Sequence, residues 1–370
     1  MAKAASEISA ADREEPSPRR EVRNFASHTW GSPAQRLSGK GGAPRHQGRW
    51  VKGKSIRHSS KSDHAETDAQ LTFRTYFTYV DAFRLLCENL DKLKAVQRTL
   101  PDFQNLFQRN SIPIDLVRGS LHRGLVNFQV MRSIPLRAFP ECALTANVWS
   151  PVQAYYAVHG VGLAAFAALT GTCPSTHGKF LSKATNDLVP LLPFPFSIIC
   201  EGNPWNSAGP RFEISGSKLQ ATEVRNTANL STANASNAEC LAVKAIMTSH
   251  THRFKDDCAD FKARKGIQRL TPSQARQLAP KVSPSSIFHF LYRLRLRSNY
   301  DDPMMFMAGQ PDAGIATIHY MNLHKITHVF LSLLLEILYA VVDSSDVAKM
   351  REIYGRYSSR FPRPDWPTSR

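Results

Sequence analysis

Residues 289–306 have the sequence HFLYRLRLRSNYDDPMMF. It places Arg293, Arg295 and Arg297 among large apolar residues at helical spacing, and it ends in a polar segment that contains a proline. An arginine is costly to bury without a partner, so these guanidinium groups must meet water, a carboxylate or a phosphate. The question is which of the three each one meets.

Projection of this helix at about 100° per residue separates its side chains into three faces. The core face carries Ile287, Leu291, Leu294 and Ser298. A neighbouring face carries Arg293, Arg297 and Tyr300 at spacings of three and four, so we expect two guanidinium groups and a phenol to converge beside the core. Arg295 points elsewhere, and we expect it to be solvated.

The composition is that of a globular protein with a basic surface. The 370 residues are 42% hydrophobic, which is enough for one large domain or two ordinary ones. The formal net charge is +17, and residues 1–61 hold 13 lysines and arginines against 5 acidic residues. Such an excess favours polyanions such as RNA, although a basic surface that only confers solubility is an equal alternative.

The cysteines and the N-terminal sequence indicate a cytoplasmic protein. The 6 cysteines are scattered without Cys-x-x-Cys spacing, as is typical of free thiols in a reducing compartment. The N-terminal region has no apolar run of the kind found in secretory signals. The apolar stretch 326–342 approaches the length of a membrane span, but Glu336 at its middle favours a buried core helix. We therefore expect no membrane segment.

The chain is expected to form one helical domain between two tails. Residues 1–66 are rich in Ser, Gly, Pro, Arg and Lys, and we expect a disordered basic tail. Residues 67–345 carry helical apolar patterns and form the domain, and residues 346–370 form a C-terminal extension. Within the domain, residues 190–282 predict an irregular insertion of loops with an occasional strand or short helix, because Pro, Gly, Asn and Ser are frequent there.

Helical patterns flank the insertion and predict a mostly α-helical fold. The predicted helical segments are a stripe from Asp68 to Pro101, a helix from Ser150 to Gly171, the arginine-bearing helix after Ser285 or Ser286, and a helix from about Asp312 to Val342. In the second of these, Ser150 is the expected cap and Pro151 lies in the first turn. Small residues along it allow the close approach of another helix, and they are Ala154, Ala157, Gly160, Ala164 and Ala168.

Two blocks of the sequence resemble the HEPN-domain family of small bacterial proteins. Residues 155–159, Tyr-Tyr-Ala-Val-His, and residues 174–178, Pro-Ser-Thr-His-Gly, are similar to a Tyr-Tyr-Ala-x-x-His-like helix and the loop that follows it in that family. Residues 293–302, RLRLRSNYDD, resemble an arginine-rich helix that ends in Ser/Ala-Asp-Tyr, with Asn299 where Asp is usual. The two blocks are about 40 and about 20 residues long.

The resemblance implies an up-and-down bundle of four or five helices that forms a homodimer with its arginine motifs facing each other. Many members are metal-independent endoribonucleases that act as toxins or in phage defence, so it implies an antitoxin or nucleotidyltransferase partner and no cofactor. Arg293 would face the phosphate, Tyr300 would lie near the place of the motif His, and Arg297, His159 and His177 complete the implied catalytic set. The implied RNA contacts are Asn299, Arg295 and Lys179.

The motif His itself is missing, which leaves three functions open. No histidine lies four to six residues after Arg293 or Arg297, and tyrosine, with a pKa of about 10 against about 6.5, is the poorer proton acceptor at neutral pH. Either His159 or His177 supplies a base, or the domain binds RNA, a nucleotide or a partner protein without cutting. In the third alternative the protein is a helical scaffold, and the arginines pair with the aspartates at the helix end or with Glu336.

Overall fold

The computed structural model describes residues 66–106, 112–136, 138–205, 211–213, 224, 232–343 and 346, all within the compact unit Asp63–Arg370. The predicted disordered tail, apart from Glu66, and the predicted C-terminal extension, apart from Asp346, lie outside these residues. The described part is mostly α-helical, as predicted.

The helices up to the insertion are α1 (Asp68–Leu86), α2 (Leu90–Thr99), α3 (Pro101–Gln104), α4 (Ile114–Arg132), α5 (Cys142–Thr170) and α6 (His177–Asp187). Those that follow are α8 (Ala238–Lys265), α9 (Pro272–Leu278), α10 (Ile287–Leu296), α11 (Met304–Met307) and α12 (Ala313–Val341). Short helical turns are η1 (Val189–Leu191), η3 (Ala279–Lys281) and the π-helical η4 (Arg297–Asp301). Two short strands, β1 (Ile199–Glu201) and β2 (Arg211–Glu213), pair antiparallel.

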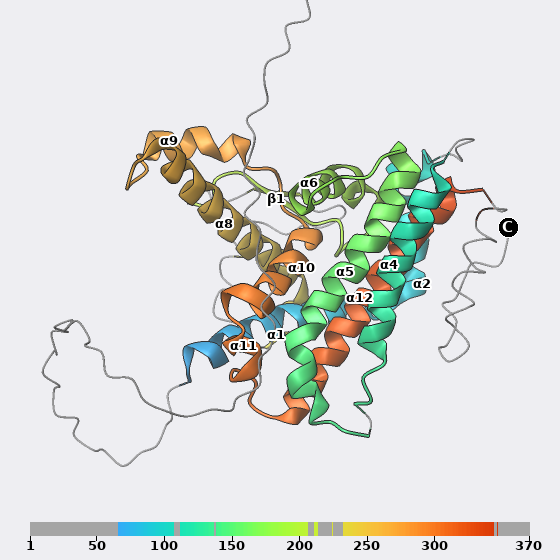
Figure 1. The fold of residues 1–370 in the computed structure, drawn as a ribbon, viewed down its shortest axis with the longest axis horizontal. Coiled ribbons are helices and arrows are strands. Elements are labelled where there is room, and N and C mark those ends of the chain that lie inside the picture. The colour runs from blue at the N-terminus through green and yellow to red at the C-terminus, as the bar shows by residue number, and fades with distance from the viewer. Residues whose placement is uncertain are drawn as a thin grey trace, which may run out of the picture. The chain divides into compact units, whose positions relative to one another are not determined.

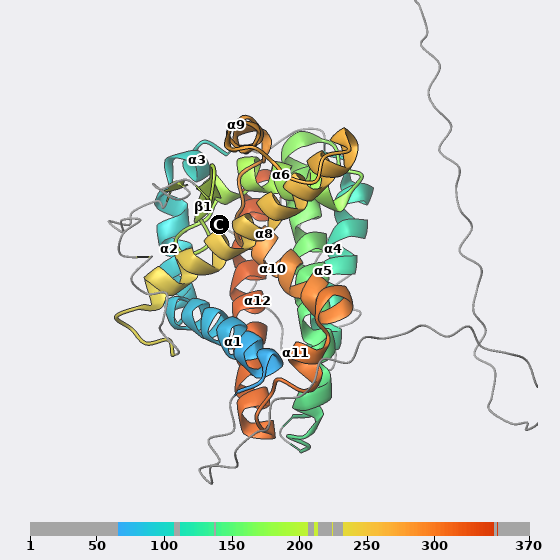
Figure 2. The ribbon, with the colours of Figure 1, turned by 90° about the vertical axis from the view of Figure 1, so that its left-hand side faces the viewer.

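Helix α5 is the centre of the bundle and packs along both α4 and α12 (Figures 1 and 2). The contact with α4 is very close, because Gly160 of α5 faces Gly124 of α4. A Cβ atom on Gly160 would lie 2.5 Å from the backbone nitrogen of Gly124 and 2.6 Å from its Cα. The predicted close approach through small residues is therefore confirmed.

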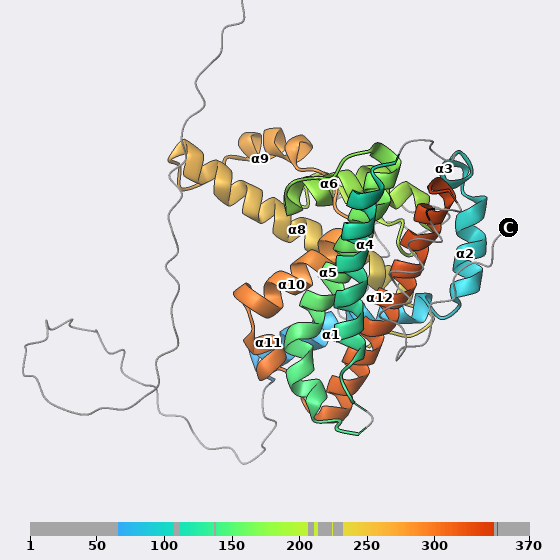
Figure 3. The ribbon, with the colours of Figure 1, turned by 45° about the vertical axis from the view of Figure 1, so that its right-hand side comes forward.

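A second group of helices crosses this bundle. Helix α1 packs against α8 and α12, and α10 packs against α5 and α8 (Figure 3). Aromatic rings fill the space between α1 and α10, where the ring centroids of Phe83 and Phe290 are 5.6 Å apart. This crossing brings α10, which carries Arg293 and Arg295 and leads into Arg297 of η4, against the face of α5 that carries the Tyr-Tyr-Ala-Val-His block.

Helices α5 and α12 are each long and apolar enough to cross a membrane, but 72% and 67% of their most apolar windows are buried inside the fold. Glu336 of α12 is itself buried, with an exposed fraction of 6%. Its carboxylate lies 3.3 Å from Lys94 Nζ and 2.6 Å from Arg98 Nη2, both on α2. The carboxylate in the middle of this apolar helix is therefore paired with cations of α2, not with the arginines of α10.

The predicted start of α5 was wrong. The helix begins at Cys142 instead of Ser150, so Pro151 lies inside it. A proline in a helix costs one backbone hydrogen bond, and here tertiary contacts of the extra turns outweigh that cost. Asn147, for example, donates from Nδ2 to Gln310 Oε1 at 2.7 Å and to the carbonyl of Ala316 at 2.8 Å. The predicted end at Gly171 is confirmed by its left-handed φ of 78°.

The predicted irregular segment 190–282 also differs, because it contains the 28-residue helix α8. The two short strands lie in this segment as predicted. Helix α8 shows no continuous apolar stripe, since its first half is buried among neighbouring elements and its second half is charged. Buried positions of the first half include Leu241, Ala242, Val243, Ala245 and Ile246. Tertiary burial, not a one-sided pattern, is what makes this segment helical.

Candidate functional site

Helix α10 begins with a capping box formed by Ser286 and His289, which confirms the predicted start. The predicted core face is also confirmed, since Ile287, Leu291, Leu294 and Ser298 all have exposed fractions of 1% or less. The three arginines therefore lie on the remaining faces of a firmly placed helix.

Arg293 and Arg297 pair with carboxylates that lie beside α10. Arg293 Nη1 is 3.6 Å from Asp256 Oδ2, and its Nη2 is 3.3 Å from His252 Nδ1, both on α8. Arg297 Nη1 donates to Asp302 Oδ2 at 3.4 Å. Both arginines are thus held by neighbouring groups, as in the alternative in which they connect elements of the fold.

The prediction that Arg295 is solvated was wrong. Its exposed fraction is 8%, and its Nη2 donates to Tyr156 Oη at 3.0 Å. Its guanidinium carbon lies 5.0 to 5.8 Å from the ring centroids of Tyr155, Tyr156, Tyr292 and Tyr300. The side that looked free on an isolated helix is the side that α5 covers. These four tyrosines, Arg295, His159 and His177 are called the Arg295 cluster below.

The two histidines of the resemblance are neighbours in the Arg295 cluster. The ring centroids of His159 and His177 are 4.8 Å apart, and His177 Nδ1 lies 2.8 Å from Tyr155 Oη. Burial lowers the pKa of His159 to about 4, and the charges of His177, Arg123 and Arg295 act in the same direction. Burial and then the charge of Arg295 also lower the pKa of His177. Both imidazoles are therefore neutral at pH 7.

The remaining predicted site residues are Tyr300, Asn299 and Lys179, and of these Tyr300 contacts Arg295. Tyr300 has an exposed fraction of 67%, and its ring lies 5.8 Å from the guanidinium carbon of Arg295. Asn299 is half-buried and Lys179 is exposed. Helix α6 fixes the place of His177, because Thr176 caps the helix by accepting a hydrogen bond from the backbone N–H of Lys179 at 3.3 Å.

Tyr155 and Tyr156 belong to the block that carries the resemblance but were not predicted as site residues, and two further residues of this site were missed in the sequence. Tyr292 precedes Arg295 by three positions, which places both on one side of α10, so helical spacing alone could have found it. Arg123 lies on α4 and influences His159 through its charge. Nothing in the local sequence of α4 indicates that contact, because it depends on how α4 and α5 pack.

Within the described residues, no group of three His, Cys, Asp or Glu side chains is arranged to hold a metal ion. Comparison of the chain with protein-family models, with curated proteins and with solved structures finds no match. The function is therefore inferred from the geometry of the Arg295 cluster.

Proposed function

We propose that this protein is HEPN-like and binds RNA through the Arg295 cluster. The observation that carries the proposal is the setting of Arg295, whose positive charge lies among four tyrosine rings. No carboxylate described in the structure lies within salt-bridge distance of it, whereas Arg293 and Arg297 each have one. The Nε atoms of all three arginines are buried without a described acceptor, so the missing carboxylate is what sets Arg295 apart. A guanidinium with unused donors is suited to grip a phosphate, since it stays charged and donates in a planar fork.

The aromatic part of the cluster favours single-stranded RNA as the ligand. Unpaired bases stack on aromatic side chains and on arginine, whereas duplex RNA offers mainly its backbone and its shallow groove. Tyr300 is the most exposed ring of the cluster, with an exposed fraction of 67%, and is available for such stacking. The net charge of +17 adds a sequence-independent attraction to the phosphate backbone.

The experiment compares three single-charge variants on the same helix, Arg293→Gln, Arg295→Gln and Arg297→Gln. Affinity for labelled total tRNA and for a generic single-stranded RNA is measured by fluorescence anisotropy without added metal. Arg295→Gln is expected to weaken binding by about tenfold, the effect of one lost charge-assisted contact. The other two variants serve as matched controls and are expected to have smaller effects, because Asp256 and Asp302 already hold those arginines.

Because Arg295 is buried, its variant must be checked by circular dichroism, and an exposed position provides an independent test. Tyr300→Ala removes an exposed ring and is expected to weaken single-stranded RNA binding by about tenfold through lost stacking. The proposal is wrong if folded Arg295→Gln and Tyr300→Ala both bind RNA as the wild type does.

A second candidate function is metal-independent cleavage of RNA, and the pairing of His159 with His177 favours it. In such a reaction one imidazole accepts the proton of the 2′-hydroxyl, the 2′-oxygen attacks phosphorus, and the leaving 5′-oxygen takes a proton from an acid. At pH 7 a neutral imidazole is able to accept the proton of the 2′-hydroxyl. The second histidine would act as the acid and must be protonated for that role. The negative phosphate of bound RNA favours this, because it raises the pKa of a nearby histidine.

We expect cleavage, where it occurs, to be faster at pH 6 than at pH 8 and to be lost in His177→Ala with RNA affinity nearly unchanged. The measurement is a gel assay of labelled RNA in the presence of a chelator, with binding measured in parallel. Equal cleavage by wild type and His177→Ala would contradict this candidate. If the wild type binds RNA without cleaving it, the cleavage candidate is wrong and only the RNA-binding proposal remains.

A further inference from the structure

The second half of α8 and α9 form a part of the molecule with its own small core. Its buried residues are Phe254, Cys258, Leu278, Ala279 and Val282, which cluster separately from the main core. In Figures 1 and 3 this half of α8 and α9 extend beyond the α4–α5–α12 bundle. The Arg295 cluster does not include any residue of this part, so a ligand bound here would occupy a different site.

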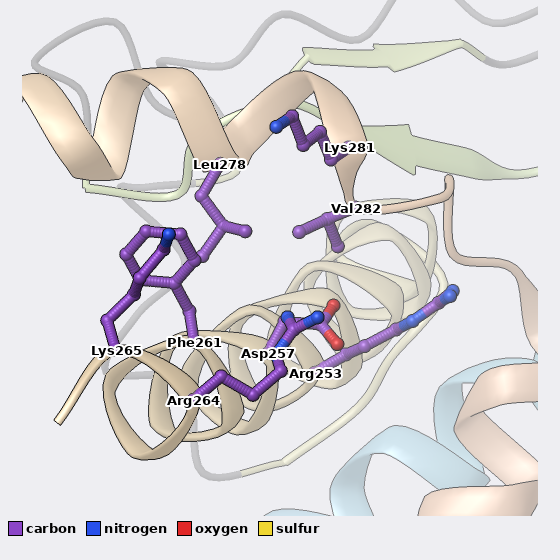
Figure 4. A pocket seen from close by; sticks show the side chains of 8 residues that line it. All are labelled: Arg253, Asp257, Phe261, Arg264, Lys265, Leu278, Lys281 and Val282. Carbon is purple, nitrogen blue, oxygen red and sulfur yellow. The ribbon is translucent and has the colours of Figure 1, made fainter. Parts of the chain in front are cut away.

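A hollow of about 560 Å³ lies between α8 and the α9–η3 segment. Its lining residues are Arg253, Asp257, Phe261, Arg264, Lys265, Leu278, Lys281 and Val282 (Figure 4). The volume falls within the range of small-molecule sites. Four of the eight lining residues are cationic and one is a carboxylate, so the lining carries an excess of positive charge, which attracts anions.

One of these cations already has internal partners. Arg253 donates to the carbonyls of Ser283 and Pro284 at 3.2 and 3.3 Å, and its Nη1 lies 2.6 Å from His289 Nε2. It is therefore a positioning group for α10. Arg264, Lys265 and Lys281 have exposed side chains. The charge of Arg264 also acts on Asp257, and its Nε donates to the carbonyl of Asp260 at 3.4 Å, so the positive charge open to a ligand comes mainly from the two lysines.

The arrangement of these three cations is not explained by helix stability alone. Arg264 and Lys265 lie in the last turn of α8, where cations are favoured by the helix dipole. Lys281 belongs to η3 on the opposite wall, and in Figure 4 its side chain lies along the α9–η3 ribbon, across the hollow from α8. Neither lysine forms a salt bridge with a carboxylate that the structure describes.

We propose that this hollow binds a nucleotide, with Arg264, Lys265 and Lys281 holding its phosphates. A nucleotide, unlike a free phosphate, also needs an apolar surface for its base, and part of the lining is apolar. Phe261 of α8 is partly exposed and packs against the small core to which Leu278 and Val282 belong, and all three line the hollow (Figure 4). The exposed part of the Phe261 ring is the surface offered to a base. Phosphate binding by several cations and base binding by an aromatic ring are separable, and this gives the proposal its test.

The first test measures binding of ATP and of pyrophosphate to the full chain by isothermal titration calorimetry. The variant Lys265→Glu/Lys281→Glu is expected to weaken binding of both ligands by about tenfold or more, because two attractive charges become repulsive. The matched control is Lys92→Glu/Lys255→Glu, which makes the same change in net charge at exposed lysines outside the hollow. It is expected to bind both ligands as the wild type does.

The second test separates a nucleotide from a free anion. Phe261→Leu keeps an apolar side chain against the small core, and it is expected to weaken ATP binding by about tenfold and leave pyrophosphate binding unchanged. The proposal is overturned if the wild type shows no saturable ATP binding, or if the two charge variants lose the same amount of affinity. It is also overturned if Phe261→Leu binds ATP with the affinity of the wild type. Loss of RNA affinity without loss of ATP affinity in Lys265→Glu/Lys281→Glu would also overturn it, since the hollow would then be part of an RNA surface.

Discussion

Replacement of Gly160 by alanine is expected to lower the free energy of unfolding by about 3 kcal/mol. The added Cβ would lie 2.5 Å from the backbone nitrogen of Gly124 and 3.0 Å from the backbone oxygen of Ser120. Both are backbone atoms of α4, so no side chain can rotate to make room. The helices must separate along an interface at the centre of the bundle, and chemical denaturation monitored by circular dichroism measures the cost.

Gly119 on α4 provides the matched control for this prediction. A Cβ atom there meets nothing within 4 Å. Gly119→Ala is therefore expected to raise the free energy of unfolding by about 0.5–1 kcal/mol, because alanine is the better helix former. Equal effects of the two substitutions would show that α4 and α5 are not in close contact through Gly160.

The second large effect is a loss of stability in acid through His319. This histidine of α12 is fully buried, and neither of its ring nitrogens has a hydrogen-bond partner among the described atoms. Its ring lies among Phe73, Phe77 and Phe306, at centroid distances of 5.2, 6.1 and 5.8 Å. Burial in these apolar surroundings lowers the pKa of His319 to about 3.

The direction of the effect follows from where the proton binds. In the unfolded chain His319 takes up a proton below a pKa of about 6.5, whereas the folded protein resists protonation down to about 3. The stability contributed by the neutral form is complete above pH 6.5 and is lost progressively as the pH falls toward 3. At pH 5 the loss from this one residue is about 2 kcal/mol.

The measurement is urea denaturation of wild type and His319→Leu at pH 7 and at pH 5. The wild type is expected to lose about 2 kcal/mol more than the variant between the two pH values, since all other titrating groups are common to both. At pH 7 the variant is expected to be at least as stable, because leucine leaves no unpaired ring nitrogen in the core. An identical pH dependence of the two proteins would contradict the burial of a neutral His319.

Helix ends and the core face of α10 were predictable because they depend on residues close together in the chain. Ser286 and His289 are three positions apart and cap α10 by local hydrogen bonds. Gly171 ends α5 because glycine adopts the left-handed conformation without strain. The start of α5 was not predictable in this way, since the turns before Pro151 are stabilised by contacts with residues far along the chain.

The residues of the candidate site also fall into two groups, those that local sequence predicts and those that depend on contacts between distant segments. The residue types and their helical spacing in the sequence indicated Arg293, Arg297 and Tyr300 on one side of α10, and the HEPN resemblance indicated His159 and His177. Local sequence patterns were thus enough to predict a mostly helical protein with a basic charge and arginines beside a buried face. It did not determine which arginine would be surrounded by aromatic rings.

That choice was made by the tertiary structure. Arg295 donates to the hydroxyl of Tyr156, which precedes it by 139 residues, because α5 packs across the side of α10 that carries Arg295. The pairing of Arg293 with Asp256 and the burial of the first half of α8 depend on packing between helices in the same way. Spacing along one helix fixes the direction of a side chain, whereas its partner is set by the helix that packs against it, and that information is spread over the whole chain.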